Sequence, residues 1–348
     1  MSLANILLIW YEGYKRDLPW RKDKDPYKIW VSEVMLQQTR VEVVKPYFKR
    51  WINRFPTLES LATAQEEEVI QYWQGLGYYS RARNLLRGVQ EVQATYGGQV
   101  PITKDEVIGI SGIGDYTAGA ILSIAYDKIE PAIDGNVLRV FSRLYCIEGD
   151  ISSPIVKRQI RALVEKEISV ERPGDFNQAL MDLGATICIP KVPRCENCPL
   201  QNACKAKNMG RQQQLPVKKK KTPPLPVQLV AGVLQQGEFF LLRRRPVKGL
   251  LAGMWEFPAV EIPIGEDAMD VFQRGFLCNT GQEVEVKTLL LQCIHTFSHR
   301  RWDISFYNCI GRSATRPIGK DLCWIHKADW TNLSFAGPHR KMASYLCT

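Results

Sequence analysis

The sequence predicts a multi-domain protein in which an all-α domain is followed by an α+β domain. Three observations predict it. The first 210 residues carry apolar residues at helical spacing, separated by Gly and Pro. Residues 211–226, RQQQLPVKKKKTPPLP, are rich in lysine and proline and have little to bury, as in a linker. From Val227 onward, short strand-like runs replace the helical pattern. We therefore expect a helical domain over residues 1–210, a basic linker over 211–226 and an α+β domain over 227–348.

Length and charge are compatible with a nucleic-acid partner. The chain has 348 residues, with 46 Lys and Arg against 36 Asp and Glu, and a formal net charge of +10. The length suits two domains, and the positive charge permits an anionic partner without demanding one. The sequence has no apolar run of about eighteen residues and no signal-peptide pattern at its start. We expect a protein that is neither membrane-bound nor secreted.

The first helix of interest follows Asp25-Pro26, a dipeptide typical of a helix start. It reads YKIWVSEVMLQQT. Glu33 shares a helix column with Ile29 and Leu36, and this apolar border favours the protonated carboxyl group that a general acid requires. A surface glutamate at the edge of the apolar stripe is the alternative.

A second pair of helices is predicted near residues 105–125. Thr103 and Glu106 have the spacing of a capping box, and the following segment contains Gly112-x-Gly114. Because a capped helix and not a strand precedes these glycines, a tight hairpin between two helices fits better than a dinucleotide-binding loop. Such a hairpin exposes backbone N–H groups that can bind one phosphate. A plain helix–helix turn remains the alternative.

Asp134, in PAIDGNVLRVFSRLY, precedes a helix with an apolar face and occupies the N-cap position. Helix N–H groups keep a capping carboxylate ionised. An ionised Asp134 and a protonated Glu33 would form the acid and anion that cleavage of an N-glycosidic bond requires. A purely structural cap is the alternative.

Four of the ten cysteines form a cluster over residues 188–204, with the spacing C-x6-C-x2-C-x5-C. In a reducing compartment this cluster indicates a metal site. The spacing alone leaves open a zinc ion or a [4Fe–4S] cluster. The cluster consists of Cys188, Cys195, Cys198 and Cys204.

The second domain is predicted from four strand-like runs, VQLVAGVLQ, EFFLLRRR, VEVKTLLLQCIHTF and WDISFYNCI, and from a helix near Asp267–Leu277. Its turns and the mixture of strands with a helix indicate an α+β fold.

Six separated motifs carry a resemblance to a known family. They are SEVMLQQT, GLGYYSRARNL, ISGIGDYTAGAIL, AIDGNVLRV, FNQALMDLGA and the cysteine cluster. In sequence and order the chain resembles the helix-hairpin-helix DNA glycosylases, and among them the adenine DNA glycosylases of the MutY type, over almost its whole length. The resemblance implies an all-α helix-hairpin-helix glycosylase domain with an iron–sulfur cluster loop. It also implies a Nudix-like C-terminal domain.

The resemblance implies roles for single residues. Glu33 matches the general acid that protonates the departing adenine, and Asp134 matches the carboxylate that stabilises the sugar intermediate. Asn136 is expected to support Asp134. Position 116 carries Tyr116, where the endonuclease III type has a lysine that cleaves the strand, so the chain resembles the monofunctional branch.

Further roles follow from the same resemblance. The cysteine cluster is expected to bind [4Fe–4S]. Base removal requires the adenine to leave the stack. The expected pocket residues are Trp20, Arg21, Leu36 and Gln178, and the residues expected to probe the mismatch are Gln38, Leu76 and Tyr78.

The Nudix-like domain is expected to recognise and not to hydrolyse, because the stretch AMDVFQRGFLCNTG lacks the clustered glutamates that hold magnesium. The family motif that contacts 8-oxoguanine appears here as Phe297, Ser298 and His299.

The resemblance therefore implies an adenine DNA glycosylase activity on A:8-oxoguanine or A:G mispairs in double-stranded DNA. We expect a monomer, cytoplasmic and associated with the nucleoid if the source is bacterial. Three alternatives remain: a glycosylase with lyase activity, a non-catalytic DNA-binding protein with an iron–sulfur cluster, and a Nudix hydrolase fused to a DNA anchor.

Overall fold

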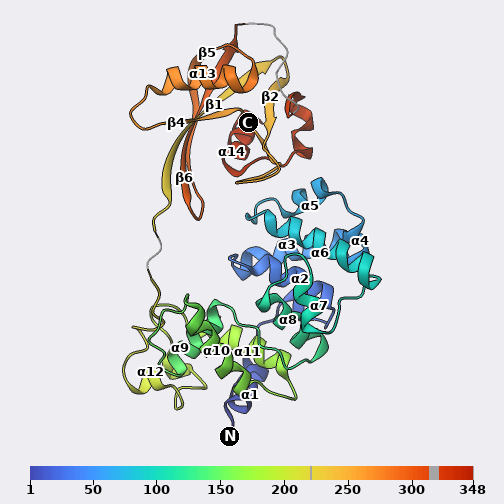
Figure 1. Cartoon of the computed structure of the whole chain (residues 1–348), viewed down its shortest axis with the longest axis vertical. Helices are drawn as coiled ribbons and strands as arrows, with labels where there is room; N and C mark the ends of the chain where they lie inside the picture. The colour runs from blue at the N-terminus through green and yellow to red at the C-terminus, as the bar shows by residue number, and fades with distance from the viewer. Residues whose placement is uncertain (220–221, 313–320, 348) are drawn as a thin grey trace. The chain divides into compact units, whose positions relative to one another are not determined.

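The chain divides into two compact units, Met1–Lys220 and Lys221–Thr348 (Figure 1). The computed structural model describes residues 1–219, 222–312 and 321–347. The first unit is helical and the second combines a sheet with helices. This confirms the predicted fold class, an all-α domain followed by an α+β domain.

The helical unit consists of helices joined mostly by short loops. Single 3-10 turns lie at Pro19–Arg21 and Cys195–Asn197. The α-helices are α1 (Leu3–Tyr14), α2 (Pro26–Leu36), α3 (Val41–Arg54), α4 (Leu58–Ala62), α5 (Glu66–Trp73), α6 (Ser80–Tyr96), α7 (Lys104–Gly109), α8 (Asp115–Tyr126), α9 (Gly135–Leu144), α10 (Pro154–Glu167), α11 (Pro173–Thr186) and α12 (Lys205–Asn208).

Local sequence signals explain where two of these helices begin. The Asp25 side chain accepts a hydrogen bond of 2.9 Å from the Tyr27 N–H at the start of α2, as predicted. The capping box predicted for α7 is wrong. The Thr103 hydroxyl donates to the Glu106 carboxylate, and within the described residues neither side chain caps a backbone N–H of α7. The two side chains form a hydrogen bond with each other and do not accept one from the first N–H groups of the helix.

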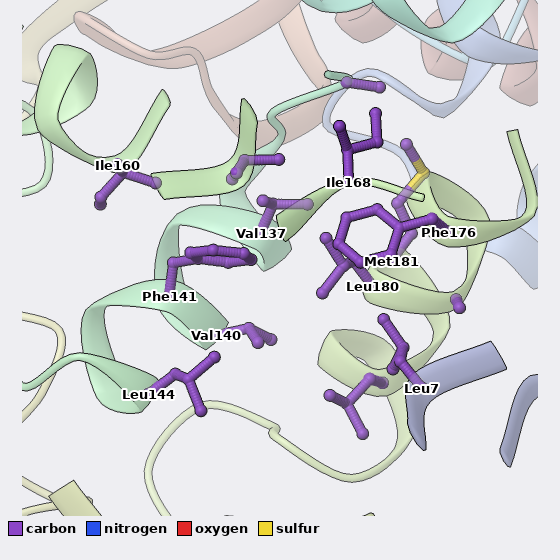
Figure 2. Packing of buried hydrophobic residues seen from close by; sticks show 14 of the residues in the cluster. Leu7, Val137, Val140, Phe141, Leu144, Ile160, Ile168, Phe176, Leu180 and Met181 are labelled. Carbon is purple, nitrogen blue, oxygen red and sulfur yellow. The ribbon is translucent and has the colours of Figure 1, made fainter. Parts of the chain in front are cut away.

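One core of the helical unit lies between α1, α9, α10 and α11 (Figure 2). Phe141 and Phe176 are fully buried there, together with Leu7 and Ile160. A second group of buried aromatic residues includes Trp51 and Trp73, whose rings meet edge to face at 5.5 Å. Helix α2 packs against α3, α6 and α8. It therefore links these parts of the unit.

The second unit contains a seven-stranded sheet with the main order β3-β2-β1-β6-β5; β4 also pairs with β1 and β7 with β2. Strands β1 and β6 are parallel, and the other pairs are antiparallel. The strands are β1 (Leu225–Gln236), β2 (Phe239–Arg244), β3 (Trp255–Glu256), β4 (Ala259–Ile262), β5 (Val284–Thr296), β6 (Arg300–Gly311) and β7 (Leu322–His326).

Helices cover both faces of this sheet. On α13 (Ala268–Thr280), Phe272 and Phe276 pack in one apolar cluster. On α14 (Gly337–Cys347), Met342 and Ala343 pack in another. The four predicted strand runs correspond to β1, β2, β5 and β6, and the predicted helix corresponds to α13. The structure adds β3, β4, β7 and α14, which the sequence analysis does not predict.

The connection between the units begins inside the helical unit. Leu215 is 2% exposed, and its carbonyl oxygen accepts a hydrogen bond of 2.9 Å from Arg143 Nε. The Val217 carbonyl accepts another from the Ile151 N–H at 3.0 Å. The first half of the predicted linker is thus anchored to the helical unit, and residues 220 and 221 lie outside the described residues.

Candidate active site

A pocket of the helical unit is lined by many of the residues to which the sequence analysis assigns a role. Its walls come mainly from α2, α8, α9 and α11 and from neighbouring loops. Segments far apart in the chain therefore meet in one place. The predicted site residues that line the pocket are Trp20, Arg21, Glu33, Leu36, Gln38, Gly114, Tyr116, Asp134, Asn136 and Gln178.

Glu33 is a buried carboxylic acid within α2, with 5% of the residue exposed. The Tyr116 hydroxyl donates a hydrogen bond to Glu33 Oε2. Burial raises the pKa of Glu33 to about 7; the charge of Asp134 acts in the same direction, whereas Tyr116 and Arg21 oppose the shift. A large share of Glu33 therefore carries a proton near neutral pH. This is the state that a general acid requires.

Asp134 is the N-cap of α9. Its Oδ1 accepts hydrogen bonds of 2.8 Å from the backbone N–H groups of Asn136 and Val137. These bonds act to lower the pKa of Asp134, but burial outweighs them, and the pKa is raised above its usual value. The expectation that capping alone decides the charge of Asp134 was therefore incomplete, because desolvation competes with the helix N–H groups.

Asn136 joins Asp134 to a residue that the sequence analysis missed. Asn136 Nδ2 donates to Asp134 Oδ2 at 2.6 Å, and Arg139 Nη2 donates to Asn136 Oδ1 at 2.8 Å. Arg139 Nε also donates to the Cys188 carbonyl oxygen at 2.8 Å. The Asp134 carboxylate is thus connected to the start of the cysteine segment through two side chains. The spacing of Asn136 and Arg139 on one helix face was the available signal.

Arg21 is held at the pocket by a buried carboxylate that the sequence analysis also missed. Asp182 has a side chain that is fully buried, and it accepts hydrogen bonds of 2.7 and 2.9 Å from Arg21 Nη1 and Nη2. Arg16 Nε donates to the same carboxylate at 2.7 Å. The arginines lower the pKa of Asp182 against the effect of burial. Two guanidinium groups and one carboxylate therefore leave net positive charge beside Glu33.

The predicted hairpin joins α7 to α8. Gly112 has φ +82°, and a Cβ there would lie 2.7 Å from the Asn84 Cβ, so both the backbone angle and the space favour glycine. Gly114 is the N-cap of α8, and nothing lies within 4 Å of a Cβ built on it. The space beside Gly114 is thus open, and the first turn of α8 presents Tyr116 to Glu33.

Three residues expected to probe the mismatch lie on two loops. Gln38 follows α2, is exposed and has φ +58°. Leu76 and Tyr78 lie in the loop between α5 and α6, where Leu76 is 7% exposed and Tyr78 is 49% exposed with φ +47°. Only Gln38 of the three lines the pocket. The Leu76 side chain is therefore buried, whereas the Tyr78 ring is accessible.

The four clustered cysteines line a second pocket together with apolar residues that include Leu144 and Leu200. Arg143 Nη1 lies 3.3 Å from Cys188 Sγ, within donating distance. In the described parts of the chain, no three His, Cys, Asp or Glu side chains are grouped closely enough to hold a single metal ion. The candidate donor set thus consists of four thiols around one apolar space.

The residues expected to contact 8-oxoguanine lie at the turn between β5 and β6. Phe297 packs edge to face on His295 and Trp302, with ring centroids 4.5 and 4.9 Å away. Ser298 and His299 are exposed. An aromatic side chain thus supports the turn from beneath, and the two polar residues face solvent.

No helix in the described ranges combines the length and the apolar character needed to cross a membrane.

Comparisons with known proteins agree with this architecture. The sequence matches the HhH-GPD superfamily of base excision DNA repair proteins over residues 31–166 and the NUDIX domain over residues 229–345. It is 38% identical to the adenine DNA glycosylase of Rattus norvegicus, across 91% of this chain and 73% of that protein. It is also 38% identical to the adenine DNA glycosylase of Homo sapiens, across 98% of this chain and 73% of that protein.

Solved structures resemble the helical unit. A thermostable thymine-DNA glycosylase aligns with a TM-score of 0.55 and 27% identity, covering 59% of this chain and 95% of that one. A trapped endonuclease III–DNA covalent intermediate aligns with a TM-score of 0.51 and 22% identity, covering 60% and 94%. The second similarity concerns the fold alone.

Proposed function

This chain belongs to the adenine DNA glycosylases, base excision repair enzymes of the HhH-GPD superfamily, and we propose that it removes adenine paired with 8-oxoguanine or guanine in double-stranded DNA. The observation that carries the proposed chemistry is the juxtaposition in one pocket of a buried glutamic acid, a capping aspartate and a tyrosine hydroxyl.

Glu33 acts as the general acid in this proposal. A carboxyl group whose pKa is about 7 gives up a proton readily near neutral pH, and about half of its molecules still carry the proton there. The hydrogen bond from Tyr116 leaves the second carboxyl oxygen of Glu33 to carry the proton toward the pocket. Protonation of the adenine ring makes the base a better leaving group.

Asp134 stabilises the positive charge that develops on the sugar as the bond to adenine breaks. Its Oδ1 is occupied by two backbone N–H groups, and Oδ2 by Asn136, so the carboxylate orientation is fixed before the substrate arrives. Water then attacks the sugar and leaves an abasic site.

Strand cleavage through a Schiff base is not part of the proposal, because Tyr116 offers no amine. Borohydride trapping on substrate DNA tests this point, and efficient covalent capture would contradict it. Lys157 also lines the pocket, so Lys157→Ala shows whether any capture arises from that amine.

The extruded adenine is proposed to enter the pocket between Trp20, Arg21, Leu36 and Gln178. Gln38, Leu76 and Tyr78 would occupy the gap left in the duplex. The proposal is supported by the two loops that carry these three residues, one of which leads directly from the helix of Glu33.

The four cysteines would hold a [4Fe–4S] cluster, each thiolate binding one iron. Four thiols around an apolar space, with Arg143 Nη1 within donating distance of the Cys188 sulfur, are a donor set compatible with such a cluster. When bound, the cluster would hold residues 188–204 in one conformation.

The second unit would read the base opposite adenine through Phe297, Ser298 and His299. Its sheet-side helix α13 carries Asp270 and no glutamate, which supports recognition without hydrolysis. Replacement of Ser298 and His299 by alanine should lower the preference for A:8-oxoguanine over A:G and leave the A:G rate unchanged.

The decisive experiment is a single-turnover glycosylase assay on A:8-oxoguanine, A:G and A:C duplexes, with Glu33→Gln as control. Adenine release from the first two duplexes by the natural chain, and its loss in the variant, is the expected result. Unchanged release by Glu33→Gln would refute the assignment of the acid. No release from any duplex would refute the substrate.

A further inference from the structure

The guanidinium group of Arg81, in the first turn of α6, contacts two segments that carry proposed functional residues. Arg81 Nη1 donates hydrogen bonds to three backbone carbonyl oxygens at the end of α2. The acceptors are those of Val34 at 2.7 Å, Met35 at 3.0 Å and Gln37 at 2.7 Å. The last carbonyl groups of a helix have no partner within the helix, and a cation there is favourable.

The second Nη of Arg81 reaches the loop of residues 74–79, which we call the probe loop because it carries Leu76 and Tyr78. Arg81 Nη2 donates to the carbonyl oxygens of Leu76 at 3.3 Å and Gly77 at 3.1 Å. One planar group thus bonds simultaneously to the helix of Glu33 and to the probe loop.

The positive charge of Arg81 has no carboxylate partner among the described residues. The guanidinium group lies instead over the rings of Trp73 and Tyr78, 5.2 and 5.7 Å from their centroids. Burial lowers the pKa of Arg81 to about 10, so the group remains charged at neutral pH. Its Nε also lacks an acceptor among the described residues. Backbone carbonyl oxygens and aromatic rings therefore offset the desolvation of its charge in place of a carboxylate.

Backbone conformation supplies the second observation. Gln38 and Tyr78 both have left-handed backbones, with φ +58° and +47°. Each directly follows a residue whose carbonyl oxygen Arg81 binds, Gln37 and Gly77. Non-glycine residues keep such angles only where several contacts hold them. Both residues are among those proposed to probe the mismatch. Arg81 therefore fixes the backbone next to Gln38 and next to Tyr78.

We propose that Arg81 is a positioning residue that couples the probe loop to the base pocket, so that filling of the gap in the duplex and placement of the extruded adenine beside Glu33 occur as one movement. The inference rests on the proposed function. Lysine cannot replace arginine in this role, because its single ammonium group lacks the planar set of donors that reaches both segments.

The test uses the full chain and the variants Arg81→Lys and Arg81→Ala, with Arg83→Lys as the matched control on the same helix. Arg83 forms a surface ion pair with Glu66 at 2.7 Å and carries no proposed role. One readout is the single-turnover rate of adenine release from an A:8-oxoguanine duplex. The second is the rate at which 2-aminopurine, placed opposite 8-oxoguanine, becomes fluorescent as it leaves the stack.

Arg81→Lys should slow both extrusion and adenine release by roughly tenfold to a hundredfold, whereas Arg83→Lys should match the natural chain. The pH profile of the remaining activity should be unchanged, because Glu33 keeps its surroundings. On a duplex in which adenine faces an abasic analogue, no base pair has to be broken, and the deficit of the variant should shrink.

An equal deficit of Arg81→Lys on both duplexes, or normal extrusion with slow release, would overturn the coupling and leave a structural role only. Wild-type activity of Arg81→Lys would overturn it as well. If Arg81→Ala does not fold, the lysine variant still decides the matter. Failure of the natural chain to release adenine from the A:8-oxoguanine duplex would instead refute the proposed function, which is a distinguishable result.

Discussion

The burial that raises the pKa of Glu33, and so suits it to act as an acid, also lowers the stability of the fold at high pH. Its pKa rises from an ordinary value of 4.5 to about 7 because the side chain is buried. Above pH 7 the folded chain must hold a desolvated carboxylate, which the unfolded chain exposes to water. The folded state therefore loses stability as the pH rises from about 4.5 to 7, and the loss is complete above 7.

We expect Glu33→Gln to lower adenine release by roughly 10²–10⁴-fold while raising stability by about 3 kcal/mol at about pH 9. The natural chain should lose activity as the pH rises through about 7. Single-turnover rates and urea unfolding at several pH values measure both effects. Glu42→Gln, an exposed position on α3, is the control. A stability gain that is equally large at pH 4 would contradict the explanation.

Asp182 offers a second prediction at this scale. Asp182→Asn removes the charge that balances Arg16 and Arg21, and Arg21 acts to lower the pKa of Glu33. The decline of activity with pH should therefore begin at lower pH. Stability should fall by about 3 kcal/mol at neutral pH, because two guanidinium groups lose a buried partner.

The difference in unfolding free energy between the natural chain and Asp182→Asn should become smaller at acidic pH. The folded pKa of Asp182 is depressed, so its contribution is lost as the pH falls through that value. Asp175→Asn, which affects a half-exposed pair with Arg172 on the same helix, is the control. An unchanged pH profile of activity would exclude an electrostatic influence on Glu33.

The residues missed from the sequence share one property. Asp182 binds Arg21 across 161 positions of the chain, and Arg81 binds the end of α2 across 44 to 47 positions. Motif spacing identifies groups that act on a substrate, such as Glu33 and Asp134. It does not identify groups that hold them, because those partners meet only after the helices have packed.

At the scale of elements, the α7–α8 hairpin separates two roles of glycine. Gly114→Ala adds a methyl group in open space and should leave stability nearly unchanged. It should weaken DNA binding for matched and mismatched duplexes alike, because phosphate contacts carry no sequence information.

Gly112→Ala is the comparison variant. It should reduce stability, since φ +82° and the contact with Asn84 both oppose a side chain. Binding titrations and thermal unfolding of the two variants separate the effects. If Gly114→Ala weakened binding to one mismatch only, the hairpin would not be a general phosphate site.

Elements were predictable where a local signal defines them. Asp25-Pro26 indicated the start of α2, and long apolar runs indicated β1, β5 and β6. The two-residue strand β3 and the short strands β4 and β7 gave no such signal, because each is defined by its pairing with β1 or β2 in the folded sheet. The Thr103–Glu106 spacing was misleading, since two capping side chains can bond to each other.

At the scale of the whole molecule, the cysteine segment should carry iron. We expect the purified chain to be brown and to contain about four iron and four sulfide ions. Cys198→Ser should lose this content and become sensitive to protease over residues 188–204. Cys146→Ser, outside the thiol pocket, should keep it. A colourless protein with stoichiometric zinc would contradict the cluster.

The anchoring of Leu215 and Val217 to the helical unit shortens the free segment that joins the two units. About seven residues separate Val217 from the start of β1, a reach of at most roughly 25 Å. A tether this short gives each unit an effective concentration in the millimolar range around the other. Once one unit has bound a duplex, even weak contacts between the other unit and the same duplex add to the overall affinity. Under the proposed function, weak contacts from the second unit would then be enough to read the base opposite adenine.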